Sequence, residues 1–187
     1  MLIYKELHNM LKRCVECAFS GIALVALLPI LVVVTITIAI IERSSPFFIQ
    51  ERIGLSKKAF RIYKFRTMLG GEITFLGRVL RKTGIDELPQ LINIMIGDMS
   101  FIGPRPLLDS DILRLGWTGD YYAKRWCMRP GITGLAQLGS KCHKKFTWVY
   151  DQYYIDHTSI CLDFKIMLLS LGIPILGKSR VKKWIHS

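Results

Sequence analysis

Acidic residues are scarce in this sequence of 187 residues. It has 14 Asp and Glu against 26 Lys and Arg, which gives a formal net charge of +12 at pH 7. A basic excess of this size indicates an anionic partner such as nucleic acid, anionic lipid or a phosphorylated ligand. Because 51% of the residues are also hydrophobic, the composition favours a membrane surface over a freely soluble nucleic-acid binder.

Proline and cysteine are also few, and the sequence has no internal repeat or low-complexity segment. Seven prolines and this hydrophobic content exclude collagen-like and disordered classes. Five cysteines, an odd number without framework spacing, suit a reducing compartment. Cys14 and Cys17 form a C-x-x-C motif, but no second pair follows at zinc-ribbon spacing. Buried thiols are therefore expected rather than a redox or metal site.

Charge is absent from residues 17–41, a run of 25 residues. As a helix this run would be about 37 Å long, enough to cross a hydrocarbon core of about 30 Å. It is too long for the apolar part of a signal peptide, and Glu42 and Arg43 stand where a cleavage site would need small residues. The run therefore predicts a membrane segment.

Pro29 lies near the middle of this apolar run. A proline removes one backbone donor and clashes with the preceding turn, so a bend is expected at Leu28 and Pro29. Basic residues flank both ends of the run: Lys12, Arg13, Arg43, Arg52, Lys57 and Lys58. The distribution of basic residues therefore does not indicate which end of the run faces the cytoplasm. A straight spanning helix and a re-entrant helix that returns to its face of entry both remain open.

The rest of the chain breaks into short segments at glycines and prolines. Alternation and β-prone residues predict a short β-hairpin with strands at residues 47–52 and 60–65. Helices are predicted at residues 73–82, 87–96, 121–126 and 144–154. The expected fold class is α+β, mainly helical and membrane-associated.

Residues 160–177 form a second apolar stretch, uncharged from residue 166 onward. Twelve uncharged residues are too few to span a bilayer. Basic residues follow directly: Lys178, Arg180, Lys182 and Lys183. The pattern predicts an amphipathic interfacial helix with its basic end on anionic lipid. A buried core helix with a solvated tail is the alternative.

An acidic pair, Asp86 and Glu87, lies between Gly84 and Pro89. Pro89 fits only the first turn of a helix, so a helix is expected to begin near Asp86. The partial positive charge of a helix N-terminus would keep both carboxylates ionised. Taken alone, such a pair is also typical of ordinary helix capping.

Cations recur on short loops around this acidic pair. They are Lys64, Arg66, Arg78, Arg81, Arg105 and Arg129, with Asp98 among them. Arginines beside glycine and proline are held on stiff loops, an arrangement suited to binding phosphate oxygens with both guanidinium amines. Each one singly fits a solvated charge, but their recurrence indicates an anionic ligand.

Seven short motifs occur in an order that resembles one known family. They are Lys12-Arg13; Ser45-Pro46 with Phe48, Gln50, Arg52 and Gly54; residues 63–68 (YKFRTM); residues 86–91 (DELPQL); residues 97–100 (GDMS); residues 103–106 (GPRP); and residues 129–134 (RPGITG), closed by Asp163 and Lys165. Each motif alone is weak. Their order and spacing over about residues 12–176 resemble the bacterial sugar transferases that act as small monotopic polyprenyl-phosphate phosphoglycosyl transferases.

The resemblance implies a membrane anchor at residues 1–43, re-entrant around Pro29, and a catalytic domain at residues 44–187 on the cytoplasmic face of the inner membrane. It implies transfer of a sugar 1-phosphate from a UDP-sugar to undecaprenyl phosphate, the first membrane step of surface glycan synthesis. Anionic membrane lipids and downstream glycosyltransferases are the further partners that it implies, and nucleic acid is not among them.

The resemblance also assigns roles to residues. In the family, the Asp of the acidic pair is the nucleophile that forms a phosphosugar ester, and this role falls on Asp86. Glu87 would assist, and Asp86 and Glu87 would hold Mg²⁺, a hard cation that prefers oxygen ligands. Phosphate binding would fall on Lys64, Arg66, Arg81, Arg105 and Arg129.

The chain departs from the family pattern at several places, and two of them bear on the anchor and on ligand binding. Leu28 replaces a common serine before the proline, so the hydroxyl that could satisfy a carbonyl freed by the bend is missing. Gly139, Ser140 and Lys141 replace a common Asn-Gly-Arg, and lysine does not fork onto phosphate as arginine does. The donor sugar therefore stays open. So do two other classes: an aspartyl-phosphate hydrolase, and a basic membrane-bound scaffold without catalysis.

Overall fold

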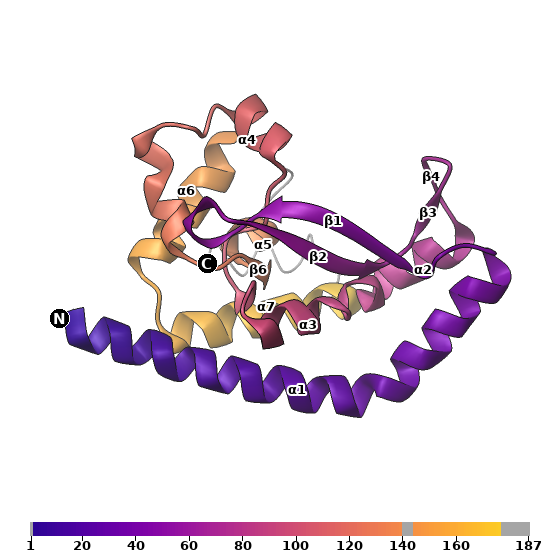
Figure 1. The fold of residues 1–187 in the computed structure, drawn as a ribbon. Coiled ribbons are helices and arrows are strands. Elements are labelled where there is room, and N and C mark those ends of the chain that lie inside the picture. Colours follow the sequence, from indigo (N-terminus) through magenta and orange to yellow (C-terminus); the bar gives the residue numbers. More distant parts are fainter. Residues whose placement is uncertain (1, 140–143, 177–187) are drawn as a thin grey trace. The chain divides into compact units, whose positions relative to one another are not determined.

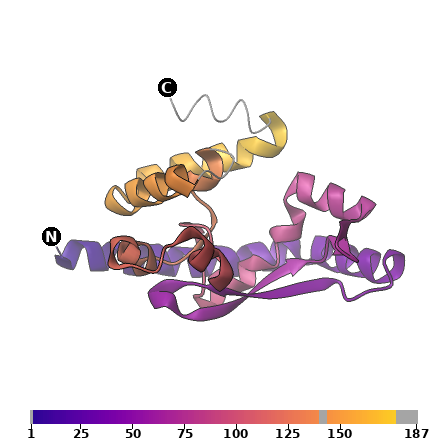
Figure 2. The same cartoon turned by 90° about the horizontal axis from the view of Figure 1, so that it is seen from above.

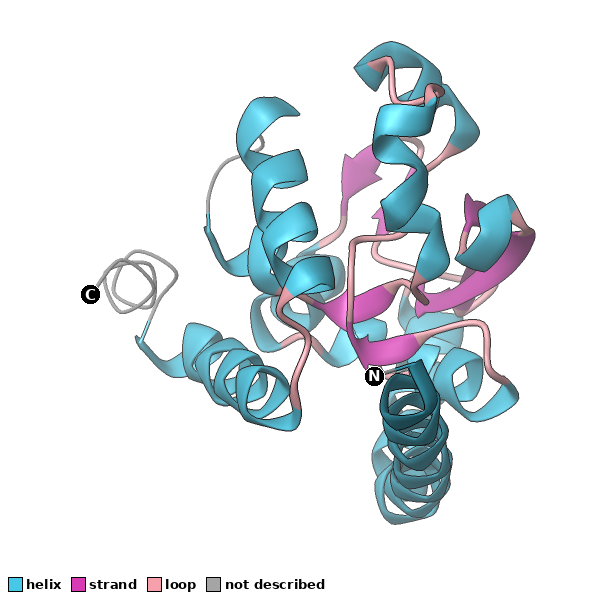
Figure 3. Cartoon of the chain, turned by 90° about the vertical axis from the view of Figure 1, so that its left-hand side faces the viewer, coloured by secondary structure: helices cyan, strands magenta, loops and turns pink. Residues whose placement is uncertain are grey.

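The computed structural model describes residues 2–139 and 144–176. Helices predominate, and the strands form short two-stranded sheets (Figure 3). The predicted mainly helical α+β class is confirmed at this level. Contacts divide the chain into two compact units, the first Met1–Gln50 with Arg61–Met99 and the second Glu51–Phe60 with Ser100–Ser187. The division into an anchor and a catalytic domain near residue 43 stays a prediction.

The apolar run lies in α1 (Leu2–Ile41), one continuous helix with Pro29 inside it. Figure 1 shows α1 bending partway along its length, and the view turned by 90° in Figure 2 shows it nearly straight. The bend therefore lies in the plane of Figure 1. Beyond the proline, Thr35 Oγ1 donates to Leu31 O at 2.7 Å, a bond that often accompanies helix bending. The helix thus bends, as Pro29 predicts.

Most of α1 is exposed. Residues 10–41 are long and apolar enough to cross a membrane, and only 6% of their most apolar stretch is buried. Large apolar side chains lie open along the helix: Val15, Phe19, Ile22, Val25, Val33 and Ile36. Cys14 is exposed and Cys17 is half-buried, so the expectation of buried thiols is wrong, because little of this helix is covered.

The predicted hairpin consists of β1 (Phe47–Ile53) and β2 (Ala59–Phe65), joined by the 3-10 turn η1 (Leu55–Lys57). The two strands pair in one sheet and run in opposite directions (Figure 1). Their observed bounds extend the predicted strands by one residue each, so the hairpin is confirmed.

Side-chain hydrogen bonds join helix α3 (Gln90–Ile96) to its neighbours in the first unit. Arg13 of α1 donates from Nη2 to Met95 O at 2.8 Å and from Nη1 to Ile94 O. Those carbonyls belong to the last turn of α3, where the usual donor four residues later in the helix is missing, although Ile94 O also accepts from Gly97 N at 3.1 Å. Arg13 therefore caps α3 from the apolar helix.

Asn93 ties α3 to β2. It is fully buried, accepts from Tyr63 N at 3.1 Å and donates from Nδ2 to Arg61 O at 2.7 Å. A buried amide that satisfies backbone groups on a strand fixes the helix against that strand. Asn93 thereby holds the helix that follows the acidic pair.

The remaining elements of the first unit are short. They are β3 (Met68–Leu69), β4 (Glu72–Ile73), α2 (Phe75–Thr83) and η2 (Ile85–Glu87). Strands β3 and β4 pair antiparallel and are too short to show a sequence pattern. The helix expected from residue 73 begins at Phe75 instead, because the Thr74 hydroxyl accepts from Gly77 N at 2.9 Å and caps it there.

Helix α2 approaches the chain beyond β2 closely at Gly77. A Cβ on Gly77 would lie 2.1 Å from Thr67 O, so only glycine permits the contact. The core of the first unit joins α1, β2 and α2 through Ile38, Phe65 and Leu80. The close approach therefore sets how α2 lies on this core.

Gly77→Ala is expected to destabilise the protein by about 1–3 kcal/mol, because the added methyl must push α2 off the Thr67 carbonyl. The midpoint of thermal unfolding in detergent micelles measures the effect. Gly119→Ala is the matched control, since no atom lies within 4 Å of a Cβ at that position. Equal midpoints for the two variants would contradict the close approach.

The second unit contains β5 (Ser100–Ile102) and β6 (Gly131–Thr133), a parallel pair. Its helices are α4 (Asp109–Leu115), η3 (Asp120–Cys127), α5 (Leu135–Gly139), α6 (Lys144–Asp156) and α7 (Ile160–Leu176). The helices predicted near residues 121–126, 144–154 and 160–177 are confirmed, the first as a 3-10 helix. One core cluster joins Ile102, Leu138, Tyr154 and Ile166, and a second joins Leu107, Ile112, Trp117, Trp126 and Trp148.

Helix α7 has one packed face and one open face. Ile166 is buried, and Tyr154 OH of α6 donates to Asp163 Oδ1 at 2.6 Å. Exposed apolar side chains recur at spacings of three and four residues on the other face: Ile160, Phe164, Leu168 and Leu171. The helix thus packs in a core and also has the apolar surface expected of an interfacial helix. The basic residues from Lys178 onward lie outside the described residues.

Candidate active site

The acidic pair, Asp86 and Glu87, lies in η2, which follows directly on α2. Gly84 separates the two elements in the left-handed conformation, with φ at 75°, which glycine adopts without strain. The turn closes through Leu88 N, which donates to Ile85 O at 3.2 Å. Both carboxylates are half-buried. A tight turn therefore holds the pair partly out of water.

The expectation that a regular helix begins near Asp86 is wrong. Helix α3 begins at Gln90, after Pro89. Pro89 has no N–H, so it cannot donate the hydrogen bond to the residue four positions earlier that a regular helix requires. The backbone hydrogen bonds around the acidic pair instead join residues three positions apart, as in a 3-10 helix. The carboxylates therefore do not stand at the N-terminus of a regular helix.

Burial raises the pKa of the Asp86 carboxyl above its ordinary value, and the adjacent Glu87 raises it further. The charges of Lys64 and Arg81 lower that pKa, as does a hydrogen bond from the Asp86 backbone. Asp86 is thus a partly desolvated carboxylate whose charge two cations offset. Burial is the largest cause of the raised pKa, and the position of Asp86 in the sequence does not predict it.

Lys64 and Arg81 reach this turn from β2 and α2. Lys64 Nζ binds Glu87 Oε1 at 2.6 Å, with the two side chains 22% and 34% exposed. Arg81 Nε donates to Thr67 Oγ1 at 2.8 Å. The first unit therefore brings together four of the predicted site residues, Asp86, Glu87, Lys64 and Arg81.

Arg66, another predicted phosphate ligand, is engaged elsewhere in the first unit. Its Nε donates to Ser45 O at 2.7 Å and its Nη2 to Phe47 O at 3.2 Å. These carbonyls belong to the segment where the chain leaves α1 and enters β1. Arg66 therefore holds this segment in place, and within the described residues it makes no hydrogen bond or ion pair with Asp86 or Glu87.

Arg105 and Arg129 lie in the second unit, in two adjoining loops that contain glycine. Gly103 N donates to Thr133 O at 2.9 Å. The approach is close, since a Cβ on Gly103 would lie 2.4 Å from Arg129 O. Two of the seven motifs, residues 103–106 and 129–134, are thus side by side, with the exposed Arg105 between two buried prolines.

A buried ion pair supports the Arg105 loop. Arg125 Nε bonds Asp151 Oδ2 at 3.0 Å, and the two side chains are 2% and 3% exposed. Arg125 Nη2 donates to Arg105 O at 2.5 Å, and its guanidinium lies over the rings of Trp117 and Trp126. Burial lowers the pKa of Arg125 and raises the pKa of Asp151, while the charge of each partner opposes the shift. No sequence pattern marks this pair.

Arg52 is a second cation beside Arg105. Its Nη1 donates to Pro106 O at 3.4 Å. Burial lowers the pKa of Arg52, as does the charge of Arg105, while Asp111 raises it. Arg52 is not among the predicted phosphate ligands, and the structure adds it to the cations around the Arg105 loop.

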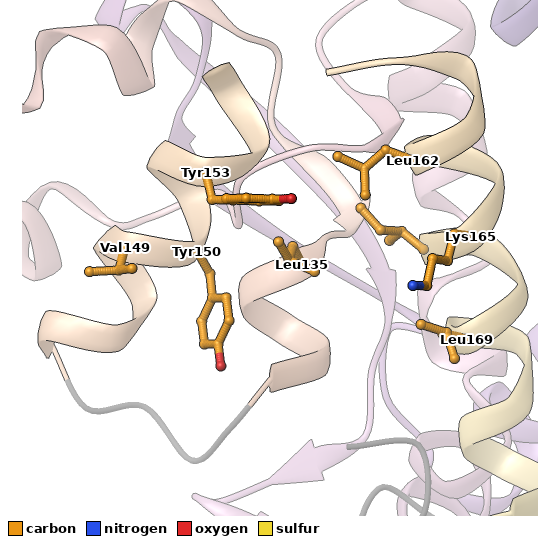
Figure 4. Close-up of a pocket in the computed structure, with 8 residues that line it drawn as sticks. Leu135, Val149, Tyr150, Tyr153, Leu162, Lys165 and Leu169 are labelled. Carbon is orange, nitrogen blue, oxygen red and sulfur yellow. The ribbon is translucent and has the colours of Figure 1, made fainter. Parts of the chain in front are cut away.

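The second unit also holds an apolar cavity of about 270 Å³ lined by α5, α6 and α7. Figure 4 shows Leu135, Tyr153 and Leu162 around it and the Lys165 amine directed toward it. Its lining has no carboxylate among the described residues. The cavity can therefore take an apolar group beside one positive charge, and it lacks the ligands of a cation site.

The acidic pair fits a Mg²⁺ ion that also binds a ligand. Over residues 2–139 and 144–176, no three side chains of His, Cys, Asp or Glu gather as a closed metal site. Mg²⁺ does not require one, because it is usually held by one or two carboxylates together with water and substrate phosphates. Asp86 and Glu87 supply two carboxylates, and the raised pKa of Asp86 reflects in part their mutual repulsion, which a cation would relieve.

Comparison with known proteins identifies the family. Residues 7–176 match the family described as bacterial sugar transferase. The chain therefore belongs to that family, as the order of its motifs predicts.

Three relatives show the range of the resemblance. The chain is 40% identical over 178 residues to the uncharacterised sugar transferase EpsL of Bacillus subtilis (strain 168), covering 86% of this chain and 85% of the relative. It is 31% identical to the UDP-N-acetylgalactosamine-undecaprenyl-phosphate N-acetylgalactosaminephosphotransferase of Aeromonas hydrophila, covering 94% and 46%. It is 32% identical to the UDP-glucose:undecaprenyl-phosphate glucose-1-phosphate transferase of Klebsiella pneumoniae, covering 92% and 42%. The chain thus spans less than half the length of the last two proteins.

Proposed function

We propose that this protein transfers a sugar 1-phosphate from a UDP-sugar to undecaprenyl phosphate. The observation that carries the proposal is the half-buried Asp86, held in a tight turn with Glu87 and influenced by the charges of Lys64 and Arg81. Membership of the bacterial sugar transferase family supports it. The names of the Aeromonas and Klebsiella relatives support undecaprenyl phosphate as the acceptor.

The first step uses Asp86 as the nucleophile. A carboxylate oxygen attacks the phosphorus that bears the sugar and forms a new O–P bond. The bond from that phosphorus to the oxygen of UMP breaks, and UMP leaves with the electron pair. Partial burial favours this attack, because fewer water molecules must be removed from the carboxylate before it reaches phosphorus.

The second step returns Asp86 to its starting state. A phosphate oxygen of undecaprenyl phosphate attacks the same phosphorus, and the bond to Asp86 breaks. The products are a lipid-linked sugar diphosphate and the free carboxylate. A covalent intermediate is an advantage here, because the two anionic substrates need not react with each other directly.

The predicted cations have different roles in this proposal. Arg81 bonds Thr67 through Nε, which leaves its Nη amines to bind donor phosphate. Lys64 holds Glu87 in place through their ion pair. Arg66, Arg105 and Arg129 are proposed as phosphate ligands by their motifs alone.

Mg²⁺ is the proposed cofactor, held by Asp86 and Glu87. When bound, it would supply positive charge that offsets the repulsion between a carboxylate and a diphosphate. Chelation with EDTA is therefore expected to lower UMP release at least about tenfold, and added Mg²⁺ should restore it. Undiminished release in excess EDTA would contradict a role for a divalent cation.

We further propose that α1 is re-entrant and that the catalytic carboxylates face the cytoplasm. Both ends of the apolar run are bonded to the first unit. Near its start, Arg13 caps α3, and just after its end, Glu42 accepts a bond from Thr74 Oγ1 at the start of α2. A helix that entered one face and left by the other could not keep both bonds to one compact unit.

Cysteine labelling tests this topology. Single cysteines at Met10 and Lys57, placed in a cysteine-free background, are expected to react with a membrane-impermeant maleimide only in inside-out vesicles. Intact spheroplasts should leave both unlabelled, and an established periplasmic cysteine serves as the control. Labelling of one position in spheroplasts and the other in inside-out vesicles would show a spanning helix.

The test of function is UMP release from a panel of UDP-sugars, with and without undecaprenyl phosphate. The expected result is catalytic release with at least one donor only when the lipid is present. Turnover that continues without lipid would indicate the hydrolase alternative. Absence of release with every donor would indicate the scaffold alternative.

A further inference from the structure

Thr67 lies just beyond β2 in the first unit and is 6% exposed. Its backbone is fixed by α2 and the residue that caps it. The Thr67 carbonyl accepts from Thr74 N at 3.2 Å, and Gly77 lies directly against that carbonyl. The place of Thr67 relative to α2 is therefore set by main-chain contacts, and its hydroxyl is not needed to hold the backbone there.

The Thr67 hydroxyl is used by Arg81. Gly77 and Arg81 are four residues apart, so they share one face of α2, the face that meets Thr67. Arg81 Nε donates to Thr67 Oγ1 at 2.8 Å. The structure gives Arg81 no other hydrogen bond or ion pair within the described residues. One hydroxyl therefore sets the orientation of this guanidinium.

The atom that Arg81 uses matters for ligand binding. A bond at Nε fixes the plane of the guanidinium and leaves both Nη amines, the pair that binds phosphate oxygens side by side. Lys64, the other cation that acts on Asp86, is already paired with Glu87 at 2.6 Å. Arg81 is thus the cation near Asp86 whose terminal amines can turn to a ligand.

We propose that Thr67 is a positioning residue, whose hydroxyl orients Arg81 so that both Nη amines meet the diphosphate of the sugar donor. This inference rests on the proposed function, in which Arg81 binds donor phosphate. Thr67 does not touch the substrate, and it acts through the direction that it gives to Arg81. Its hydroxyl lowers the entropy that a long, exposed arginine side chain would lose on binding phosphate.

Thr67→Val tests the inference, because it removes the hydroxyl and keeps the branched shape. The expected result is a fall in kcat/KM for the UDP-sugar of about tenfold, the size typical of losing a hydrogen bond to a charged group. The fall should lie mainly in KM, and the midpoint of thermal unfolding should stay close to that of the wild type. Thr67→Ser retains a hydroxyl and should recover most of the loss.

Thr83→Val is the matched control on the same helix. The Thr83 hydroxyl bonds Val79 O and Leu80 O of α2 itself. The same chemical change at Thr83 is therefore expected to alter kcat/KM by less than about twofold.

A second measurement separates orientation of Arg81 from a general structural loss. In an Arg81→Ala background, Thr67→Val should lower kcat/KM by less than about twofold, because no guanidinium remains to be oriented. Calorimetric binding of UDP to the same four proteins gives this comparison without turnover.

The outcomes separate this inference from the proposed function. Equal kcat/KM for the wild type and Thr67→Val would overturn the inference alone, as would an equal loss from Thr67→Val in both Arg81 backgrounds. A wild-type protein that neither binds UDP nor releases UMP from any donor would overturn the proposed function and this inference with it.

Discussion

Replacing Asp86 by asparagine is expected to lower kcat for UMP release by at least about 10³-fold. Asparagine keeps the size and polarity of the side chain, but its amide is too weak a nucleophile to form the ester with phosphorus. The substitution should not weaken the fold. Burial raises the pKa of Asp86, which means that its ionised carboxylate is less favourable in the folded protein than in the unfolded chain, so the fold should tolerate a neutral side chain there. The loss is therefore expected in kcat, at an unchanged or higher unfolding midpoint.

Asp120→Asn is the matched control for this substitution. Asp120 is exposed in the first turn of η3, so its replacement removes the same charge from a comparable position. Its kcat is expected to stay within about twofold of the wild type. An Asp86→Asn variant that keeps more than about a tenth of the wild-type kcat would contradict the assignment of the nucleophile.

Arg125→Met is expected to destabilise the protein by about 3–5 kcal/mol, because it leaves the Asp151 carboxylate buried without its cation. It also removes the donor to Arg105 O. The double variant Arg125→Met/Asp151→Leu should recover much of the loss, since an apolar pair leaves no buried charge. Thermal unfolding followed by tryptophan fluorescence is suited to the test, because Arg125 lies over the rings of Trp117 and Trp126.

Lys124→Met provides the comparison for Arg125→Met. Lys124 Nζ pairs with Asp156 Oδ1 at 3.1 Å between the same two elements, η3 and α6, but these side chains are 60% and 41% exposed. An exposed pair of this kind contributes about 0–1 kcal/mol, so the unfolding midpoint should change little. Equal destabilisation by Lys124→Met and Arg125→Met would contradict the claim that burial of the Arg125–Asp151 pair makes the loss of its cation costly.

Much of the candidate site follows from local sequence. Gly84 and Pro89 bracket the acidic pair, and their conformational limits predict a turn there, although they do not distinguish a regular helix from the observed 3-10 turn. The apolar run and Pro29 predict α1 and its bend in the same way. The desolvation of Asp86 could not be predicted, because it depends on how separate elements of the first unit pack around η2.

Sequence patterns do not predict the ion pair of Arg125 and Asp151, for a related reason. The two residues are 26 positions apart in η3 and α6, and charged residues in helical segments are usually solvated. Strands β5 and β6 have three residues each, too few for alternation to be recognised. Their parallel pairing is accompanied by a close contact of Gly103 and Gly131, where a Cβ on Gly131 would lie 2.2 Å from Gly103 N.

Mass spectrometry of the intact protein tests the central claim most directly. The protein is incubated with Mg²⁺ and a donor that supports turnover, in the absence of undecaprenyl phosphate. The account predicts a mass increase of one sugar phosphate that maps to the peptide containing Asp86 and disappears when the lipid is added. UMP release that requires both substrates together, with no adduct detected at any time, would contradict a covalent intermediate on Asp86.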